Sequence, residues 1–362
     1  MPTLVDLLVC ELREHDATST HTLLLRDLLV KMGAEVRLVV ERKIDHVSDH
    51  AYCHAQDIVL TDRWRSNADL TILQHSTGSE LAERVIGNRL PIVLNYHNIT
   101  PPELFEAWQP ELVTGLVSGQ RQLHYLAPLT LLGIADTHFN SRDMIEAGMT
   151  NVVVVPVLRN LKLIDPQLFP ASGAQTEAAD SATETLLFVG RLVPNKCFHD
   201  LILALSVLIR YRPKARLVLI GREVLVDYKS RLEALAERLG VRDRVLFAGE
   251  VSDQKLAAWY ERADVFVCLS EHEGFCVPLV EAMAYGVPVV AYDAAAVAET
   301  VQDAGVVLND KRPTTVATAV ERVLSDQSLR DLLCDRGIRR ANQLDVNVTS
   351  QRMRRALAGF VD

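Results

Sequence analysis

The chain has 362 residues, 49% of them hydrophobic and 23% charged, and carries a formal net charge of -9. This composition excludes a disordered or fibrous protein, and the length is enough for two globular domains that each bury a core. The negative charge gives no overall field that attracts nucleic acid, so we expect no nucleic-acid partner.

The first half of the chain alternates short apolar runs with stretches of helical periodicity. One stretch, 112–133, is amphipathic, and its pattern favours a buried helix over one lying on a membrane. Asp136 and Ser141 are typical of a strand end and a helix N-cap, which are structural roles. The strand candidates cover residues 3–10, 34–40, 69–75, 90–97, 134–140 and 151–157.

A segment with few large apolar residues follows the first half of the chain. Residues 165–184, DPQLFPASGAQTEAADSATE, are rich in Ala, Ser, Thr, Pro and acids, as linkers and exposed loops are. We therefore expect a division into a first domain, a linker or exposed loop, a second domain and a C-terminal helix that can pack back on the first domain. These parts cover residues 1–165, 166–184, 185–345 and 346–362.

The second half repeats the alternation more regularly. Its β-branched runs are apolar throughout, which is typical of strands buried on both faces of a parallel sheet. Strands that alternate with helices, such as the helical pattern at 224–240, predict an α/β fold. We expect two Rossmann-like, doubly wound parallel-sheet domains that face each other across a ligand-binding cleft. The strand candidates here are 185–190, 215–221, 244–249, 264–270, 287–292 and 305–308.

The cysteines and the N-terminal residues indicate the cellular compartment of the protein. The N-terminal residues carry acids where a secretion signal would carry basic residues, and no apolar run approaches the length of a membrane span. We expect a cytoplasmic protein, with contact at the inner face of the membrane left open. The six cysteines contain no Cys-x-x-Cys pair, so we expect neither a disulfide framework nor a metal site; they are Cys10, Cys53, Cys197, Cys268, Cys276 and Cys334.

The stretch SEHEGFCVPLVEAMAYG, residues 270–286, places two acids around a predicted helix start. Pro278 suits the first turn of a helix and Gly286 its end, so Glu273 lies in the preceding loop and Glu281 within the helix. Their carboxylates could accept hydrogen bonds from two parts of one ligand. On its own the pattern favours a plainer interpretation, in which Glu281 interacts with the helix dipole or lies on a solvated face and Glu273 is an ordinary loop acid.

A second motif follows the first strand of the second half. FVGRLVPNK, residues 188–196, contains Gly190 at the strand end and two cations, Arg191 and Lys196, that can bind phosphate oxygens. Exposed cations usually serve solubility. These two, however, lie at the same sheet edge as the Glu273 loop, so cations and acids converge there.

Taken in order and spacing, these motifs resemble the nucleotide-sugar-binding domain of retaining glycosyltransferases of family 4, which have the GT-B fold. The resemblance rests on FVGRLVPNK, VLIGRE, RVLFAGEVSDQKL, ADVFVCLSEHEGFCVPLVEAMAYGVPVVAYD and AVAETV, and covers residues 185–310. The first domain resembles a subgroup of the family more loosely, through residues 14–36, 73–82 and 96–105.

The resemblance implies roles for individual residues. Arg191 and Lys196 match the pair that binds the donor diphosphate, Glu273 the acid that holds the donor sugar, and Glu281 the acid on the ribose diol. His97 matches the active-site histidine near the transferred sugar, so the implied catalytic set is His97, Arg191, Lys196 and Glu273. The remaining donor contacts fall on Gly190, Gly249, Val251, Gly274, Phe275, Cys276 and Val277.

The residues that would contact the acceptor are harder to identify. In many family members this loop is rich in glycine, whereas here it reads ELREHDATSTHT. His15 and Asp16 stand in that loop, and Asn98 follows His97. His75 ends another predicted strand, where a structural hydrogen bond is at least as plausible as an acceptor contact. These four residues are the acceptor-side candidates.

The resemblance implies a retaining transferase that forms an α-linkage from a UDP- or GDP-sugar, in polysaccharide or glycoconjugate synthesis, with no further cofactor. The acceptor would be a carbohydrate, a lipid-linked sugar or a small molecule, and the oligomeric state stays open. If the reaction uses a front-face route, neither glutamate serves as a covalent nucleophile, unlike the paired acids of a glycosidase. The alternatives are a nucleotide-sugar epimerase and a catalytically silent nucleotide-sugar-binding protein.

Overall fold

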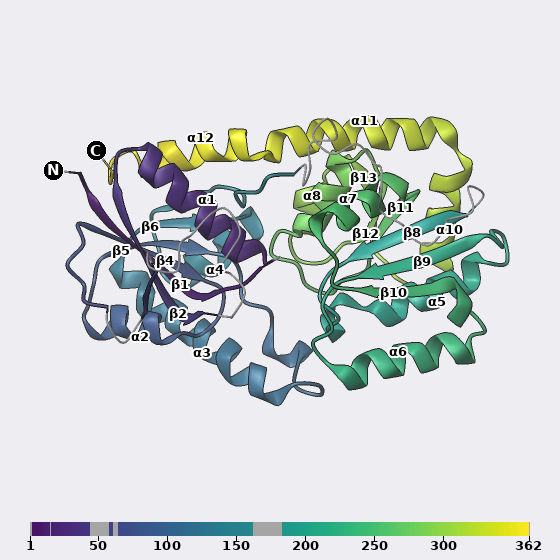
Figure 1. Ribbon diagram of the computed structural model, residues 1–362, viewed down its shortest axis with the longest axis horizontal. Coiled ribbons are helices and arrows are strands. Elements are labelled where there is room, and N and C mark those ends of the chain that lie inside the picture. The colour runs from purple at the N-terminus through teal and green to yellow at the C-terminus, as the bar shows by residue number, and fades with distance from the viewer. Residues whose placement is uncertain (1, 15, 44–57, 61–63, 162–182, 362) are drawn as a thin grey trace. The chain divides into compact units, whose positions relative to one another are not determined.

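The computed structural model describes residues 2–14, 16–43, 58–60, 64–161 and 183–361. The chain forms two compact units (Figure 1). Unit 1 comprises Met1–Arg159 with Leu344–Asp362, and unit 2 comprises Asn160–Gln343. Most of the expected linker, 166–184, lies outside the described residues, so the boundaries at 165 and 185 stay a prediction.

Among the described residues of unit 1, seven parallel strands form one sheet in the order β3-β2-β1-β4-β5-β6-β7. The central strands are apolar along their length because helices cover both faces of the sheet. The strands are β1 Leu4–Leu12, β2 Glu35–Lys43, β3 Ile58–Leu60, β4 Leu70–His75, β5 Ile92–Tyr96, β6 Thr130–Ala135 and β7 Val152–Val154; the helices are α1 Ala17–Lys31, α2 Glu80–Gly87, α3 Pro110–Leu126 and α4 His138–Glu146.

Three local predictions in unit 1 are wrong. The strand expected at 134–140 ends at Ala135, and α4 begins at His138. The N-cap of α4 is Thr137, whose side chain accepts from the backbone N–H of Asn140, so Ser141 is not the cap. The helix expected over 112–133 ends at Leu126, because the chain turns into β6.

Unit 2 repeats the same strand order on a smaller scale. Its described residues form a six-stranded parallel sheet in the order β10-β9-β8-β11-β12-β13, and the six predicted strands are confirmed. The strands are β8 Glu184–Val189, β9 Ala215–Ile220, β10 Val245–Gly249, β11 Val265–Cys268, β12 Val289–Tyr292 and β13 Gly305–Leu308; the helices are α5 Phe198–Leu208, α6 Val226–Arg238, α7 Asp253–Arg262, α8 Val277–Ala284, α9 Val297–Val301, α10 Pro313–Ser325 and α11 Gln327–Leu344.

The last helix, α12 (Val346–Leu357), belongs to the core of unit 1. Met353 and Leu357 are fully buried and join the apolar cluster that contains Leu7 of β1 and Leu25 of α1. The C-terminal helix therefore buries an apolar face that α1 and β1 alone would leave exposed.

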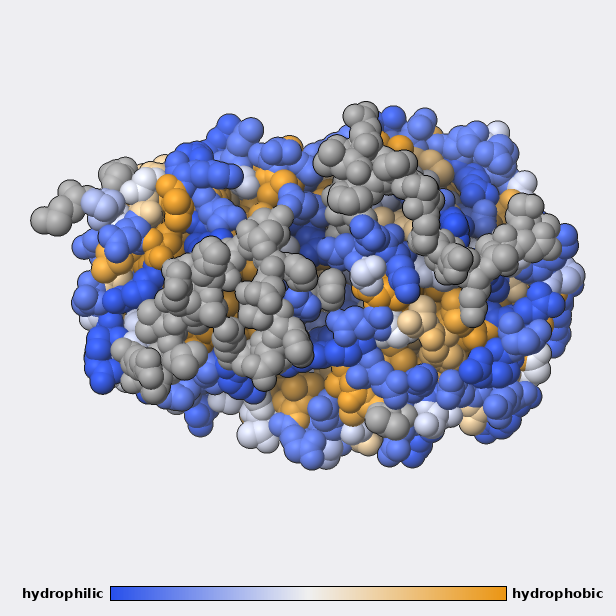
Figure 2. Space-filling model, in the orientation of Figure 1, coloured by the Kyte–Doolittle hydropathy of each residue, from blue (hydrophilic) through white to orange (hydrophobic). Residues whose placement is uncertain are grey.

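The surface shown in Figure 2 is mainly hydrophilic, with hydrophobic residues scattered over it. Scattered exposed apolar side chains such as Val30 and Ile145 are normal for a protein surface. In the described part of the chain, every helix is too short or too polar to span a lipid bilayer.

Both sheets have the strand order of a dinucleotide-type Rossmann fold, so the predicted fold class of each unit is confirmed. In such a sheet the strand order reverses beside the first strand, and ligands bind at the carboxyl ends of the strands there. In unit 2 this point lies between β8 and β11, which are paired neighbours.

Candidate functional site

The two sequence motifs of unit 2 meet at this switch point. Residues 190–196 follow β8, and residues 269–276 follow β11. The backbone N–H of Glu271 donates to the carbonyl of Asn195 at 2.8 Å, which joins the two loops directly. The convergence predicted from the sheet edge is therefore present within unit 2.

Lys196 and Glu273 form a largely buried ion pair at this junction. Nζ of Lys196 lies 2.6 Å from Oε1 of Glu273, and the side chains are 17% and 8% exposed. Burial is the largest single influence and lowers the pKa of Lys196. The attraction of Glu273, its hydrogen bond and the nearby thiols Cys276 and Cys268 together outweigh burial, so the pKa is raised. The ammonium is therefore charged at neutral pH, and the interpretation of Glu273 as an ordinary loop acid is wrong.

The loop that carries Glu273 is held by the segment after β12. The backbone N–H of Ala296 donates to the carbonyl of Glu273 at 3.0 Å, and Oγ1 of Thr300 donates to the carbonyl of Phe275 at 2.7 Å. Cys276 then adopts a left-handed conformation, with φ of 67°, as the residue before α8. This turn sets the backbone amides at the start of α8, where a helix N-terminus favours an anion.

Glu281 lies inside unit 2, one turn into α8. It is 2% exposed, and Oη of Tyr260 donates to its Oε2 at 2.9 Å. Tyr260 in turn stacks on Tyr285 with 5.3 Å between ring centroids. The interpretation that places Glu281 on a solvated helix face is therefore wrong, because the acid is enclosed and held by a hydrogen bond.

Close backbone packing shapes the neighbouring loops. The N–H of Gly190 donates to the carbonyl of Ile220, and the N–H of Gly221 donates to that of Gly249. A Cβ atom on Gly221, which has φ of +145°, would lie 2.0 Å from the carbonyl oxygen of Gly190. Only glycine fits at 221, a requirement that the sequence motifs did not indicate.

The remaining donor-side candidates line the same loops. Arg191 is exposed directly after Gly190, whereas Phe275 and Val277 are buried beside the start of α8. Gly274 and Val251 are half-buried in the loops after β11 and β10. All of these residues belong to unit 2.

In unit 1, His97 directly follows β5 and is held at both ring nitrogens. Nδ1 lies 2.8 Å from Oδ2 of Asp136, and Nε2 lies 2.6 Å from Oε1 of Gln74. The side chains of His97 and Asp136 are 4% and 3% exposed. Since a carboxylate only accepts hydrogen bonds, Nδ1 donates to Asp136 and the ring orientation is fixed.

Sequence reasoning missed the partners of His97. Gln74 lies in β4 and Asp136 follows β6, and these strands flank β5 in the sheet. Asp136 was interpreted as a structural strand end. Polar residues at the ends of three adjacent strands were the available signal, because the carboxyl ends of parallel strands meet at one sheet edge.

Two further histidines lie buried in unit 1. Nε2 of His75 bonds the carbonyl of Gly119 at 2.9 Å, and burial lowers the pKa of His75 to about 4. Nε2 of His21 lies 2.8 Å from Oδ1 of Asn95, and its ring contacts His97 edge-on at 4.8 Å. Burial, and then the charge of His97, place the pKa of His21 well below its ordinary value. These contacts favour the structural role for His75.

The other acceptor-side candidates have local partners as well. Asp16 caps α1, because its carboxylate accepts from the backbone N–H of Ser19 at 2.9 Å. Asn98 has φ of 68° and its Nδ2 donates to Asp143 at 3.2 Å. His15 lies outside the described residues. An acceptor role for these residues stays a prediction.

Comparison with known proteins supports the resemblance. Residues 174–340 match the family model of glycosyl transferases group 1. An uncharacterized glycosyltransferase of Methanocaldococcus jannaschii is 38% identical over 150 residues, which cover 41% of this chain and 37% of that protein. A D-inositol 3-phosphate glycosyltransferase of Kineococcus radiotolerans is 29% identical over 284 residues, covering 72% of this chain and 64% of that protein.

These matches span 37% and 64% of the lengths of the two curated relatives. The structure of Anabaena HepE in complex with UDP and glucose is similar over its full length, with a TM-score of 0.76, 19% identity and coverage of 99% of this chain and 100% of that chain. At this identity the likeness shows the fold alone. This confirms the predicted GT-B fold, and the family resemblance is confirmed by the family-model match over residues 174–340.

Proposed function

We propose that this chain, a GT-B protein related to the group 1 glycosyl transferases through residues 174–340, is a retaining glycosyltransferase. It would move a sugar from a nucleoside diphosphate to a hydroxyl acceptor and form an α-linkage, in polysaccharide or glycoconjugate synthesis. The observation that carries this proposal is the buried Lys196–Glu273 pair at the switch point of the unit 2 sheet.

The pair suits the charge that glycosyl transfer creates. As the bond from the anomeric carbon to the diphosphate breaks, negative charge collects on the departing phosphate. A preorganised cation with little exposure to water stabilises that charge most effectively. Lys196 would serve this purpose together with Arg191 and the amides at the start of α8. Arg191 is more exposed, so Lys196 carries the larger share.

The two acids would hold the neutral parts of the donor. Glu273, beside the diphosphate cation, would accept hydrogen bonds from sugar hydroxyls, and Glu281 would accept from the ribose diol. Tyr260 fixes one oxygen of Glu281 through its 2.9 Å hydrogen bond, which orients the carboxylate before the donor arrives. Binding would then cost less side-chain entropy.

No protein nucleophile is needed in a front-face route. The acceptor oxygen forms a bond to the anomeric carbon on the face that the diphosphate leaves. The acceptor proton passes to the departing phosphate oxygen, so atoms and charge balance. His97 is the residue of unit 1 that we propose contacts the transferred sugar, with Asp136 fixing the orientation of its ring.

The experiment is a screen of UDP- and GDP-sugars for thermal stabilisation, since a ligand that binds only the folded state raises apparent stability. Transfer from the selected donor to a panel of acceptors follows, with the anomeric configuration of the product read by NMR. Donor consumption with an α-linked product from an α-linked donor supports the proposal. An inverted product would refute the retaining mechanism.

The two alternatives give different results in the same experiment. An epimerase would convert the sugar of the donor without any acceptor, so sugar analysis of the donor incubated alone identifies it. A silent binding protein would be stabilised by a nucleotide sugar but would transfer to no acceptor. Lack of stabilisation by every nucleotide sugar would contradict all three functions.

A further inference from the structure

Two thiols and one carboxylate converge in the loop that carries Glu273. The side chains of Cys268, Glu273 and Cys276 each offer a ligand atom, and these atoms all lie within 4.8 Å of one another. The residues are 0%, 7% and 7% exposed. Sulfur and carboxylate oxygen are ligands that Zn²⁺ and other thiophilic divalent cations bind.

The sequence did not indicate this cluster, because Cys268 and Cys276 are separated by seven residues rather than two. Cys268 is the last residue of β11, and Cys276 precedes α8. Cys276 has a left-handed backbone, with φ of 67°, and its thiol lies within 4.8 Å of the Cys268 thiol. Their mutual hydrogen bond lowers the pKa of Cys268, while burial and then that bond raise the pKa of Cys276.

The distances suit one bound ion. Zn–S bonds of about 2.3 Å in a tetrahedral site place ligand atoms about 3.8 Å apart. The three ligand atoms already lie within 4.8 Å of one another. The distance between any two of them would therefore shorten by no more than about 1 Å when the ion binds. Two thiolates and the Glu273 carboxylate would balance one divalent cation together with the Lys196 ammonium, so binding would leave no net buried charge.

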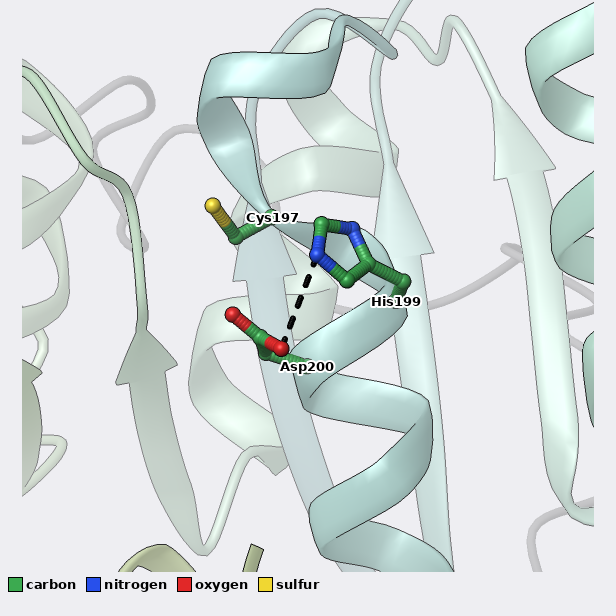
Figure 3. Close-up of side chains that lie close together, drawn as sticks. All are labelled: Cys197, His199 and Asp200. Atoms are coloured by element: carbon green, nitrogen blue, oxygen red, sulfur yellow. Dashed lines mark ion pairs between the residues drawn. The ribbon is translucent and has the colours of Figure 1, made fainter. Parts of the chain in front are cut away.

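A second trio gives an instructive contrast. Cys197, His199 and Asp200 also gather three ligand atoms within 4.8 Å at the start of α5, and Figure 3 shows the His199 ring turned toward Asp200. The ammonium of Lys311 already fills this place, because its Nζ lies 3.2 Å from Cys197 Sγ and 2.9 Å from Asp200 Oδ2. A metal ion there would have to displace an ammonium that contacts both a thiol and a carboxylate, whereas in the first trio the Lys196 ammonium is hydrogen-bonded to the Glu273 carboxylate.

We propose that Cys268, Cys276 and Glu273 form a binding site for a thiophilic divalent cation such as Zn²⁺, and that occupancy blocks the donor-sugar site. Binding releases the two thiol protons to solvent and forms two sulfur–metal bonds and one oxygen–metal bond. A metal-bound Glu273 carboxylate can no longer accept hydrogen bonds from sugar hydroxyls. The proposal that a metal site exists depends only on the geometry of the three side chains. The proposal that a bound metal blocks the donor sugar also depends on the proposed function.

Cadmium is a suitable probe, because Cd²⁺–thiolate bonds absorb in the ultraviolet. Cd²⁺ is titrated into the reduced, full-length protein and followed by absorbance and calorimetry. We expect one site in the wild type, and an affinity at least about tenfold weaker in Cys268→Ser and Cys276→Ser. Cys334→Ser removes a half-buried thiol of α11 and Cys197→Ser tests the second trio; both should bind as the wild type does.

Folding of each variant is checked by circular dichroism and thermal unfolding. Cys268→Ala and Cys276→Ala serve as second variants, since buried cysteine behaves as a small apolar residue. Unchanged cadmium absorbance in folded Cys268 and Cys276 variants would overturn the proposal. So would loss of binding in Cys197→Ser alone, which would assign the metal to the other trio.

The proposed effect of bound metal on donor binding is tested in a separate experiment. Cd²⁺ should weaken nucleotide-sugar binding at least about tenfold in the wild type, with recovery on chelation, and should have no such effect in folded Cys276→Ser. Cadmium bound at the thiols without any change in donor affinity would refute the block and leave the site standing. Cadmium binding in a protein that binds no nucleotide sugar would refute the proposed function alone.

Discussion

Nζ of Lys196 lies 2.6 Å from Oε1 of Glu273, and the two residues come from loops that follow neighbouring strands of the unit 2 sheet. Both side chains are largely shielded from water, at 17% and 8% exposure. Loss of one partner would leave the other charge buried without compensation. The pair is therefore a preformed charge site, in contrast with the Lys229–Glu223 pair of the same unit, whose side chains are 34% and 33% exposed.

Replacing either partner should reduce transfer strongly. We expect Lys196→Ala and Glu273→Ala each to lower kcat/KM by about a hundredfold or more, because a cation or acid aimed at the reacting centre is lost. Circular dichroism should show an intact fold. The matched control is Lys229→Ala, which removes an exposed ion pair and should change kcat/KM less than about twofold. Near-normal rates in both site variants would refute the assignment.

Chelation should not abolish transfer. Donor phosphate charge is balanced in our proposal by Lys196, Arg191 and the start of α8, so no divalent cation is required for binding. We expect initial rates in excess chelator to equal or exceed those in untreated buffer, because any inhibitory ion at Cys268 and Cys276 would be removed. Loss of activity in chelator that a single metal restores would contradict this.

The fold of unit 2 could be predicted from sequence because its strands are continuous apolar runs with clear breaks. The convergence of Lys196 with Glu273 followed from their positions after two such strands. What could not be predicted depends on backbone geometry. Cys276, which meets Cys268, has a left-handed backbone, and no local sequence pattern predicts this conformation because non-glycine residues rarely adopt it.

Unit 1 was harder to predict for a related reason. The run IADTHFN contains an apolar strand end followed at once by a capped helix, and periodicity alone cannot separate two short elements that share a boundary. Asp136 therefore looked structural. Its contact with His97 depends on the order of β4, β5 and β6 in the sheet, and pairing order is a property of the whole fold.

Gly221 should tolerate no side chain. A Cβ atom there would lie 2.0 Å from the Gly190 carbonyl oxygen, so Gly221→Ala must shift the loop that precedes Lys196. We expect the free energy of unfolding to fall by about 3 kcal/mol or more and donor affinity to weaken. The matched control is Gly240→Ala, which also has positive φ but no atom within 4 Å of its new Cβ. It should cost only about 1 kcal/mol; equal losses in denaturant unfolding would refute the clash.

Asp136 should act through His97. In Asp136→Asn an amide oxygen can still accept the Nδ1 hydrogen bond but brings no negative charge. We expect kcat to fall about tenfold with little change in donor KM, and the double variant with His97→Ala to be no slower than His97→Ala alone. Asp27→Asn, which removes a carboxylate paired with Arg26 on α1, is the control. Additive losses in the double variant would mean that Asp136 acts independently of His97.

Acid should destabilise the protein partly through His75. Burial lowers the pKa of His75 from 6.5 to about 4. Above pH 6.5 neither the folded nor the unfolded state protonates this ring; between pH 6.5 and 4 the unfolded chain binds a proton that the folded protein does not. The contribution of His75 to stability is therefore complete above its unfolded pKa and is lost as the pH falls toward the folded pKa.

His75→Gln isolates this contribution, because a glutamine amide can donate to the Gly119 carbonyl in place of Nε2. Between about pH 7.5 and about pH 5 the wild type should lose about 2 kcal/mol more unfolding free energy than the variant, as measured by denaturant titration. His124→Gln, at an exposed position of α3, should follow the wild type. His21 is shifted in the same direction, so the variant should keep a residual acid sensitivity. Identical pH profiles in His75→Gln and the wild type would show that His75 is not neutral in the folded protein at mildly acidic pH.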